Sequence, residues 1–210
     1  MKRLIFTWLI CAFAFNMNAQ DMASVFIAMP DQHIPQLEGA WRKDLVDLYK
    51  SGKEPRLKNT MNGFSRLDSL TTDYLLLETT ERSTIEMKLL PLINKTFVVG
   101  MITTVKGPAA DSRIQFFTTD WEPLETSDLF EAPTSDEWYL KKGVDREDPD
   151  FLKAKARLDM DLVQYQFSPE NKTLTATYTT PLYLSKEERE KVEPYLAEPH
   201  VYKWKKHHFK

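Results

Sequence analysis

The single cysteine of this chain, Cys11, lies in an N-terminal segment with the features of a secretory signal peptide. Residues 1–19 (MKRLIFTWLICAFAFNMNA) have the basic start, short apolar run and small final residue of such a peptide. Cleavage after Ala19 would remove Cys11 and leave a mature chain, residues 20–210, without any thiol. The mature chain then has no disulfide, thiolate metal site or cysteine nucleophile, so buried apolar side chains must hold its fold together.

The apolar run of the leader, Leu4–Phe15, is too short for a membrane anchor. It has about twelve residues, whereas a helix that crosses the hydrocarbon core needs about twenty. Lipidation of Cys11 needs a small residue directly before it, and Ile10 occupies that position. We therefore expect a periplasmic or secreted protein with no transmembrane segment once the leader is removed.

Composition predicts a single folded domain over residues 20–210. Hydrophobic residues make up 42% of the chain and charged residues 28%, which is the balance of a globular protein. Loss of Lys2 and Arg3 with the leader lowers the formal net charge from −3 to −5. Such a mild acidic excess argues against general nucleic-acid binding.

The beginning of the mature chain predicts helix. Met22–Met29 is a short apolar stretch that Pro30 ends, and Pro35–Ser51 has apolar residues at helical spacing. The apolar face of the second segment would consist of Leu37, Trp41, Leu45 and Leu48. Its charged residues would lie elsewhere on the helix: Arg42, Lys43, Asp44 and Asp47.

The middle of the chain predicts antiparallel strands. Tyr74–Thr80 and Thr84–Leu90 are two β-prone runs separated by three residues, which indicates a hairpin. In the second run Glu86 and Lys88 alternate with apolar residues, so we expect one face of this hairpin to be exposed to water.

Three further segments continue the β region. Thr96–Val105 is apolar in the manner of a central strand, with Gly100 as a possible bulge, and Ile114–Thr119 would pair with it. Leu162–Phe167 and Thr173–Thr179 form another predicted hairpin, whose apolar residues share one face.

The end of the chain predicts a short helix and a last strand. Ser185 and Glu188 have the spacing of a capping box, so a helix should run from Lys186 to about Tyr195. Val201–Phe209 is rich in aromatic residues and predicts a strand. The whole pattern predicts an α+β fold: a curved antiparallel sheet of six or more strands, in meanders and hairpins, packed against the N-terminal helices.

A segment of different composition, Asp120–Asp150, separates the two β regions. It has eleven acidic and three basic residues, and buried aromatic side chains should pin it to the body of the protein: Trp121, Phe130, Trp138 and Tyr139. Four of its carboxylates come close together in sequence: Asp145, Glu147, Asp148 and Asp150. We favour a solvated acidic loop over a calcium site there, because the glycine of an EF-hand loop is missing.

No motif in the chain specifies a reaction. The histidines are His33, His200, His207 and His208. They lack the HExxH spacing of zinc proteases, and His207 and His208 would point to opposite faces of a strand. The GxSxG elbow of serine hydrolases is absent. We therefore assign no catalytic, cofactor-binding or metal-binding residue, and no cofactor.

The C-terminal run YKWKKHHFK has two interpretations. Its lysines alternate with aromatic residues, a mixture that binds anionic polymers or membrane surfaces in some proteins. We favour an edge strand that lysines protect against pairing with other chains. The basic end also has the charge to dock near the acidic Asp120–Asp150.

The segment Met29–Tyr49, with MPDxxxPxL followed by WRxDLVDLY, resembles an uncharacterised family of secreted proteins from Bacteroides-type gut bacteria. The predicted β meander extends the resemblance loosely over most of the mature chain. It implies a periplasmic or extracellular location and no particular activity. In such organisms an Asp-Ser-apolar triplet can be O-glycosylated, and Asp68-Ser69-Leu70 matches that pattern.

These observations favour a noncatalytic binding or interaction protein, because the predicted sheet is rich in aromatic residues and has no convergent polar constellation. Its partner would be a protein or a glycan. The alternatives are a hydrolase that uses paired carboxylates, and a structural factor in envelope assembly. A binding protein should have an exposed hollow lined by aromatic side chains, whereas a hydrolase should have two carboxylates that shift each other's pKa.

Overall fold

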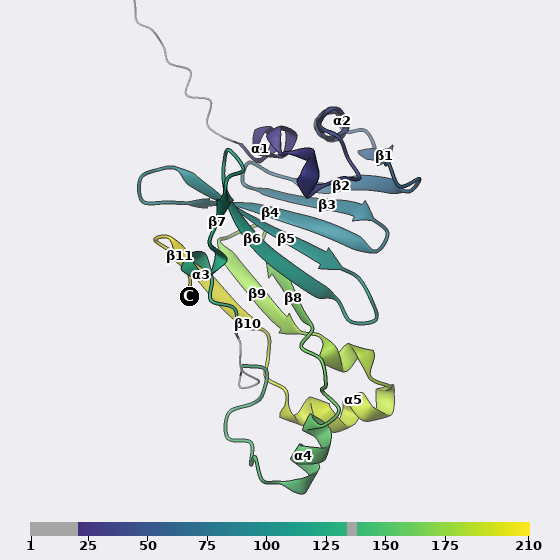
Figure 1. Ribbon diagram of the computed structural model, residues 1–210, viewed down its shortest axis with the longest axis vertical. Coiled ribbons are helices and arrows are strands. Elements are labelled where there is room, and N and C mark those ends of the chain that lie inside the picture. Colours follow the sequence, from purple (N-terminus) through teal and green to yellow (C-terminus); the bar gives the residue numbers. More distant parts are fainter. Residues whose placement is uncertain (1–20, 134–137) are drawn as a thin grey trace, which may run out of the picture.

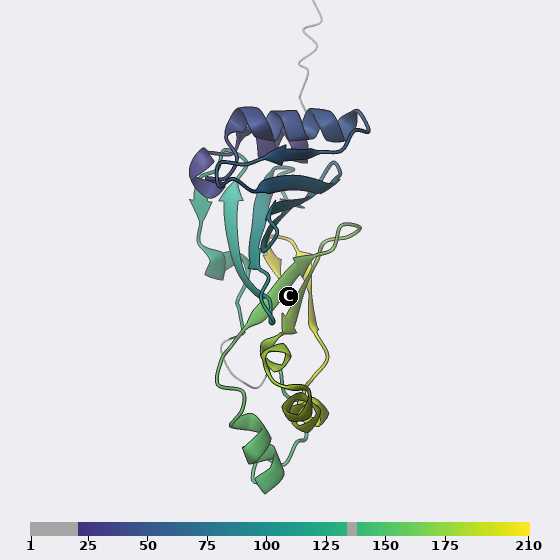
Figure 2. The same ribbon diagram turned by 90° about the vertical axis from the view of Figure 1, so that its right-hand side faces the viewer.

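The computed structural model describes residues 21–133 and 138–210. The predicted signal peptide, residues 1–19, and its cleavage site lie outside the described residues. Two N-terminal helices, α1 (Met22–Ala28) and α2 (Gly39–Lys50), cover one face of a seven-stranded sheet, and a four-stranded sheet packs against the other face (Figures 1 and 2). The predicted α+β fold is confirmed.

The larger sheet is an antiparallel meander in which every strand pairs with its neighbours in sequence. Its strands are β1 (Arg56–Lys58), β2 (Phe64–Leu70), β3 (Tyr74–Thr80), β4 (Ser83–Pro91), β5 (Phe97–Val105), β6 (Asp111–Thr118) and β7 (Pro123–Leu124). The predicted hairpin of β3 and β4 and the predicted pairing of β5 with β6 are both confirmed.

The smaller sheet has the order β11-β10-β9-β8. Its strands are β8 (Val163–Phe167), β9 (Thr173–Tyr178), β10 (His200–Lys205) and β11 (His208–Phe209). The predicted β8–β9 hairpin is confirmed, and Tyr165 lies opposite Ala176 on the predicted shared face. The single last strand predicted over Val201–Phe209 is wrong, because the chain turns at Lys206, where φ is 59°, and pairs with itself.

Short helical segments connect these layers. They are the 3-10 helix η1 (Asp31–His33), α3 (Thr126–Leu129), α4 (Pro149–Lys155), η2 (Thr180–Tyr183), α5 (Lys186–Val192) and η3 (Glu193–Tyr195). The predicted cap of α5 is confirmed, since the Ser185 hydroxyl accepts a hydrogen bond from the Glu188 amide at 3.3 Å. Helices α4 and α5 lie together at the end of the molecule remote from α1 and α2 (Figure 1).

The helix layer corrects two sequence-based expectations. Helix α2 begins at Gly39 rather than Pro35, and Arg42, which was expected on a polar face, is only 2% exposed. The Arg42 guanidinium donates to the carbonyls of Leu37 and Met29 and pairs with Asp31 at 2.9 Å. It therefore joins α2 to the loop before it, which holds that loop out of the helix.

The second face of the larger sheet is not exposed to water as predicted. Glu86 and Lys88 of β4 are 7% and 1% exposed, because the smaller sheet covers them. Gly100 makes no bulge either: it pairs regularly with Lys88 and Phe116. Apolar side chains of both sheets form the core between them, including Val98, Ile102, Phe116, Phe167 and Leu174.

Candidate functional site

An open hollow lies where the beginning of β6 meets β8 and the segment around Trp138. It has a volume of about 360 Å³. The described residues that line it are Asp111, Ser112, Pro133, Trp138, Asp161, Val163 and Tyr165. It therefore combines two aromatic rings, which the sequence analysis expects of a binding protein, with two carboxylates, which it expects in the cleft of a hydrolase.

Contacts between the two sheets hold residues that line this hollow. Asp111 is the first residue of β6, and its Oδ1 accepts a hydrogen bond from the Val163 amide of β8 at 3.2 Å. The Thr179 hydroxyl, just after β9, donates to the Ala110 carbonyl at 2.5 Å. The Asp111 carboxylate is thus held at the junction of the sheets, while its residue stays exposed to solvent.

Neighbouring rings hold the two aromatic side chains of the hollow. Tyr165 is 7% exposed, and its ring meets that of Phe130 edge to face, with centroids 5.5 Å apart. Trp138 is half-buried and packs edge to face on Tyr178, with centroids 5.9 Å apart. Both rings are therefore preorganised, which lowers the entropy that a ligand must spend to order them.

The polar groups of the described lining can donate and accept hydrogen bonds. Burial, with smaller effects from Tyr202 and Asp111, raises the pKa of Tyr165 to about 12 and keeps its hydroxyl protonated. Asp161 is exposed beside it at the edge of the hollow. The described lining offers carboxylate acceptors and hydroxyl groups, and it includes no histidine, lysine or arginine.

The most perturbed carboxyl group, Glu86, lies elsewhere. Burial raises the pKa of Glu86 to about 7, although a hydrogen bond from the Phe167 amide at 2.9 Å favours its ionised form. No second carboxylate contributes to this shift among the described residues. Glu86 is buried between the sheets and does not line the hollow, so its environment differs from that of a catalytic carboxylate pair.

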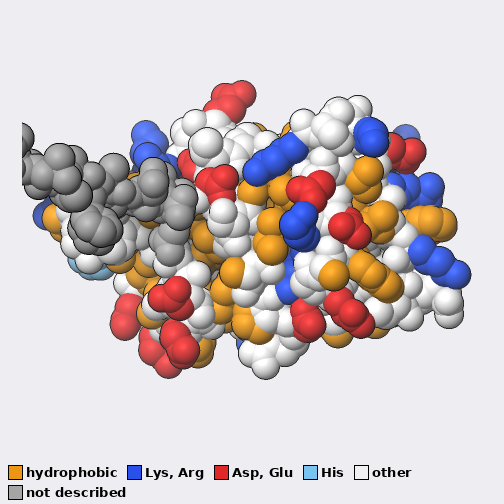
Figure 3. Space-filling model, turned by 90° about the horizontal axis from the view of Figure 1, so that it is seen from above, with side chains coloured by type: hydrophobic (Ala, Val, Ile, Leu, Met, Phe, Trp, Pro, Cys, Tyr) orange, Lys and Arg blue, Asp and Glu red, His pale blue; other side chains and the backbone are white. Residues whose placement is uncertain are grey.

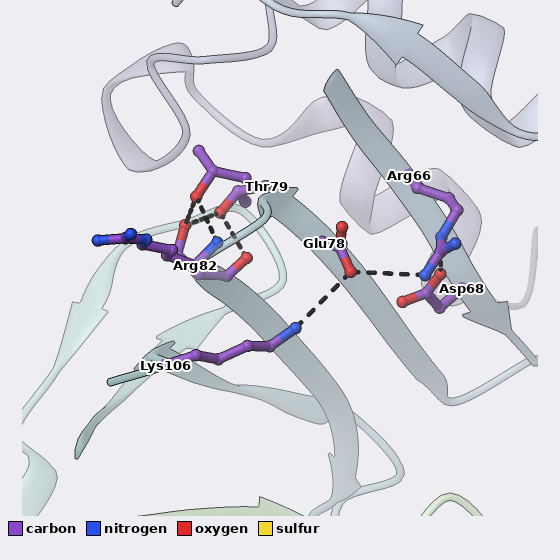
Figure 4. A network of polar contacts seen from close by, with 8 residues as sticks. Arg66, Asp68, Glu78, Thr79, Arg82 and Lys106 are labelled. Atoms are coloured by element: carbon purple, nitrogen blue, oxygen red, sulfur yellow. Dashed lines mark hydrogen bonds and ion pairs between the residues drawn. The ribbon is translucent and has the colours of Figure 1, made fainter. Parts of the chain in front are cut away.

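A charged network joins β2, β3 and Lys106, which follows β5 (Figure 4). The Glu78 carboxylate forms ion pairs with the Arg66 guanidinium, at 3.4 Å, and with the Lys106 ammonium, at 3.6 Å. The Arg66 guanidinium also pairs with the Asp68 carboxylate at 2.5 Å. The charges of these four side chains balance, so the network has no net charge to attract an ionic ligand. Ser69 follows Asp68 at a bulge of β2 and is half-buried, and its glycosylation remains a prediction.

Of the four histidines, all within the described residues, only the neighbours His207 and His208 lie with their rings close together. The His33 ring packs on Phe117 and Trp121, with centroids 4.8 and 5.4 Å away, and burial lowers the pKa of His33. His207 lies in the β10–β11 turn, so its ring lies 4.8 Å from that of His208 instead of on the opposite face. His200 is the first residue of β10.

The acidic segment around Asp145–Asp150 leads into helix α4. Asp148 caps this helix by accepting a hydrogen bond from the Asp150 amide at 2.9 Å, and Pro149 is its first residue. Over residues 21–133 and 138–210, no group of three or more acidic, histidine or cysteine side chains could hold a metal ion. The predicted pinning of this region is confirmed at Trp121, Phe130 and Tyr139, which are all buried.

The basic C-terminal run contacts α3 through aromatic rings. Phe130, which follows α3, meets Tyr202 at 5.1 Å and Phe209 at 6.3 Å between centroids. The C-terminal run was predicted to form an edge strand. The edge of the smaller sheet is β11, because β10 pairs with β9 on one side and with β11 on the other. Contact between the basic end and the acidic segment is therefore present, with aromatic packing at its centre.

Seen from the helix side, hydrophobic side chains are interspersed with Lys, Arg, Asp and Glu (Figure 3). Among the described helices, none has both the length and the apolar character needed to cross a membrane.

Comparison with known proteins places the chain among proteins of unknown function. The family model "Protein of unknown function (DUF3256)" matches residues 14–209. The fold is similar to that of a domain of an uncharacterized protein from Porphyromonas gingivalis W83, with a TM-score of 0.78 and 28% sequence identity over 89% of this chain and 96% of that one. No curated protein matches. The predicted resemblance to an uncharacterised family is confirmed, whereas a gut origin and secretion remain predictions.

Proposed function

The chain belongs to the DUF3256 family of proteins of unknown function, and we propose that it acts as an exported, noncatalytic binding protein. Its ligand would be rich in hydroxyl groups, as a glycan is, and would bind in the hollow between β6 and β8. The observation that carries this proposal is the joint presence of two held aromatic rings, Trp138 and Tyr165, and two carboxylates, Asp111 and Asp161, around an open space of about 360 Å³.

The chemistry of the hollow matches that of a sugar. The apolar faces of sugar rings pack on aromatic side chains, while carboxylates accept hydrogen bonds from sugar hydroxyls. The volume of the hollow is enough for one or two sugar rings at the end of a glycan chain, and its open shape differs from that of a buried cofactor site. Two carboxylates at the rim also favour neutral or amino sugars over uronic acids, because a third carboxylate would be repelled.

A noncatalytic role agrees with the location of the perturbed acid. A glycosidase needs two carboxyl groups on either side of the scissile bond, one of them with a raised pKa. Here the carboxyl group with a strongly raised pKa, Glu86, is 7% exposed and lies away from the hollow. This separation supports binding without turnover.

Export is proposed from the pattern of residues 1–19. Expression of the full chain in a diderm bacterium, followed by fractionation and intact-mass analysis, tests it. We expect periplasmic or secreted material that begins at Gln20. A protein that keeps Met1 and stays in the cytoplasm would contradict export while leaving the binding proposal intact.

Binding is tested with an array of defined neutral, amino and acidic oligosaccharides, followed by calorimetry on the best candidate. We expect binding of neutral or amino sugars that Trp138→Ala and Asp161→Asn each weaken by about tenfold or more, equivalent to about 1.4 kcal/mol. Tyr183→Ala and Asp44→Asn, at exposed positions away from the hollow, serve as matched controls and should bind as the unmodified protein does.

Three results would contradict this function. One is an array on which no neutral or amino sugar binds. The other is binding that the variants of Trp138 and Asp161 leave unchanged, which would locate the ligand elsewhere. The third is release of a cleaved sugar during the assay, which would show that the protein is an enzyme.

A further inference from the structure

Two charged side chains of β4 fasten the β8–β9 hairpin to the larger sheet. Glu86 accepts a hydrogen bond from the Phe167 amide at 2.9 Å, and the Lys88 ammonium donates to the Pro169 carbonyl at 3.1 Å. Phe167 ends β8, and Pro169 lies in the turn that follows it. The hairpin is therefore held through its main chain by side chains that are themselves buried.

The charges of Lys88 and Glu86, which make these two contacts, are balanced differently. Lys88 pairs with Asp73, whose carboxylate lies 3.1 Å from its ammonium nitrogen and is partly exposed. Glu86 has no cation within ion-pair distance among the described residues. Its ionised form is therefore stabilised by one backbone amide, although it is almost completely removed from water.

The groups that face Glu86 do not supply the missing charge. On β3 the same sheet face carries Tyr74 and Glu78 on either side of its cross-strand partner Leu76. On β5 its partner is Ile102, between Gly100 and Thr104, so that strand contributes no charge. Lys88 follows on β4 itself, directed to Pro169 and Asp73. Burial and then the charge of Glu86 raise the pKa of the Tyr74 phenol, so this group adds no positive charge.

We propose that Glu86 is a proton-dependent latch, which holds the β8–β9 hairpin closed when it is protonated and loosens it when it ionises. The closed hairpin buries the carboxyl group, whereas an open hairpin would let water reach it. Ionisation therefore favours the open state, because the carboxylate regains its hydration there. The raised pKa of Glu86, about 7, agrees with this geometry.

The latch does not depend on what the hollow binds. It has a consequence for the hollow, however, because β8 also carries Val163 and Tyr165, which line that space. Movement of the hairpin would shift these two residues relative to Asp111 of β6. A ligand of the hollow would then bind more tightly at pH 5 than at pH 8.

Amide hydrogen exchange tests the latch on the full mature chain between pH 5 and pH 8, after correction for intrinsic exchange rates. The equilibrium constant for opening β8 should rise with pH between the ordinary glutamate pKa and about 7, by up to about tenfold per pH unit, and level off above. Glu86→Gln keeps a carbonyl oxygen for the Phe167 amide and should show no such rise. Glu78→Gln, on the same face but partly exposed, should keep the rise.

Three outcomes would overturn the proposal. The first is a rise in opening that persists in Glu86→Gln, and the second is an unmodified protein whose hairpin opens equally at all these pH values. The third is a β8–β9 hairpin whose amides open with the same free energy as those of β2 and β3 at every pH, which would show global unfolding rather than opening of the hairpin. If Glu86→Gln folds poorly, Glu86→Met provides the same comparison without a titratable group.

Discussion

Gly100 lies so close to the ring of Phe167 that a Cβ atom built on Gly100 would stand 2.6 Å from Cζ of that ring. The two residues belong to different sheets, β5 and β8, and they meet at the centre of the interface between them. A methyl group cannot occupy this space, since real Cβ atoms essentially never approach another heavy atom below 3.0 Å. The glycine thus sets how closely the sheets approach each other.

The first prediction follows from this contact. Gly100→Ala should lower the free energy of unfolding by about 1–3 kcal/mol, the usual cost of overpacking a core. Phe167→Leu in the same chain should recover part of this loss, because the smaller side chain leaves room for the methyl group. Denaturant titrations of both variants measure the effect. Gly63→Ala, whose Cβ would have ordinary contacts from 3.6 Å, should be much milder, and equal losses at the two glycines would contradict the steric cause.

The second prediction concerns the pH dependence of stability. The pKa of Glu86 is about 7 in the folded protein and near its usual value of 4.5 when unfolded, so its stabilising contribution is present below pH 4.5 and is lost as pH rises through 7. Glu86→Gln should therefore match the unmodified protein at pH 4.5 and exceed its stability by about 2–3 kcal/mol at pH 8. Urea titrations at the two pH values measure this, and a constant difference between them would exclude Glu86 as the titrating group.

The third prediction compares how much the two kinds of interaction of Arg42, with main-chain carbonyls and with Asp31, contribute to stability. Arg42→Ala removes the donor from two main-chain carbonyls, so it should cost about 2–4 kcal/mol. Asp31→Asn should cost less than about 1 kcal/mol, because its side chain is 62% exposed and the ion pair is screened by water. Thermal unfolding of the pair compares them directly. Similar losses for both variants would mean that the ion pair, rather than the carbonyl contacts, stabilises the loop.

The fourth prediction concerns Asn59, which organises the β1–β2 turn. Its amide nitrogen donates to the Ser65 hydroxyl and the Thr79 carbonyl, each at 3.1 Å, and its oxygen accepts from the amides of Met61 and Gly63, each at 3.0 Å. Asn59→Ala leaves the amides of Met61 and Gly63 without their acceptor, whereas the Ser65 hydroxyl still donates to the Thr79 carbonyl at 2.7 Å. The substitution should cost about 2–4 kcal/mol.

A neighbouring asparagine provides the control for Asn59. Asn62 is exposed and has a φ of 61°, so Asn62→Gly removes the side chain without strain and should change stability by less than about 0.5 kcal/mol. Chemical denaturation of the two variants makes the comparison. A small loss for Asn59→Ala would show that water replaces the four hydrogen bonds.

Local patterns in the sequence predict most of the strands. The β3–β4 and β8–β9 hairpins follow from alternating residues and short connections, and the cap at Ser185 follows from its spacing to Glu188. These signals depend on neighbours in the chain, so one sequence is sufficient to find them.

The errors at Glu86, Lys88 and Gly100 concern contacts between distant segments, whereas the error at Arg42 concerns a loop close to it in sequence. Alternation at Glu86 and Lys88 indicates a polar face, yet a sheet formed some eighty residues later covers it, as the separation of 81 residues between Glu86 and Phe167 shows. Gly100 was expected to bend its strand, whereas it makes room for that same phenylalanine. Arg42 has a charge that predicts exposure, but carbonyls of the preceding loop satisfy its guanidinium. The partners of Glu86 and Gly100 lie far away in the sequence, whereas the carbonyls that bind Arg42 lie 5 and 13 residues before it.

The sequence predicts the kind of residue that lines the candidate site but not which residues form it. The sequence predicts an aromatic-lined surface without a perturbed acid, but it does not indicate that Trp138 and Tyr165 would meet Asp111, which lies 27 and 54 positions before them. The hollow forms where two sheets and a connecting segment converge, so its residues have no common motif.

The order of strands also has a consequence for how the protein is made. Each sheet pairs only neighbouring segments, so the seven-stranded meander can be completed before the ribosome has finished the last quarter of the chain. Until that part arrives, the apolar underside at Val98, Ile102 and Phe116 is uncovered on a newly made intermediate. A chaperone that shields this surface during synthesis or translocation would prevent aggregation, and a truncation before β8 should precipitate unless such a helper is supplied.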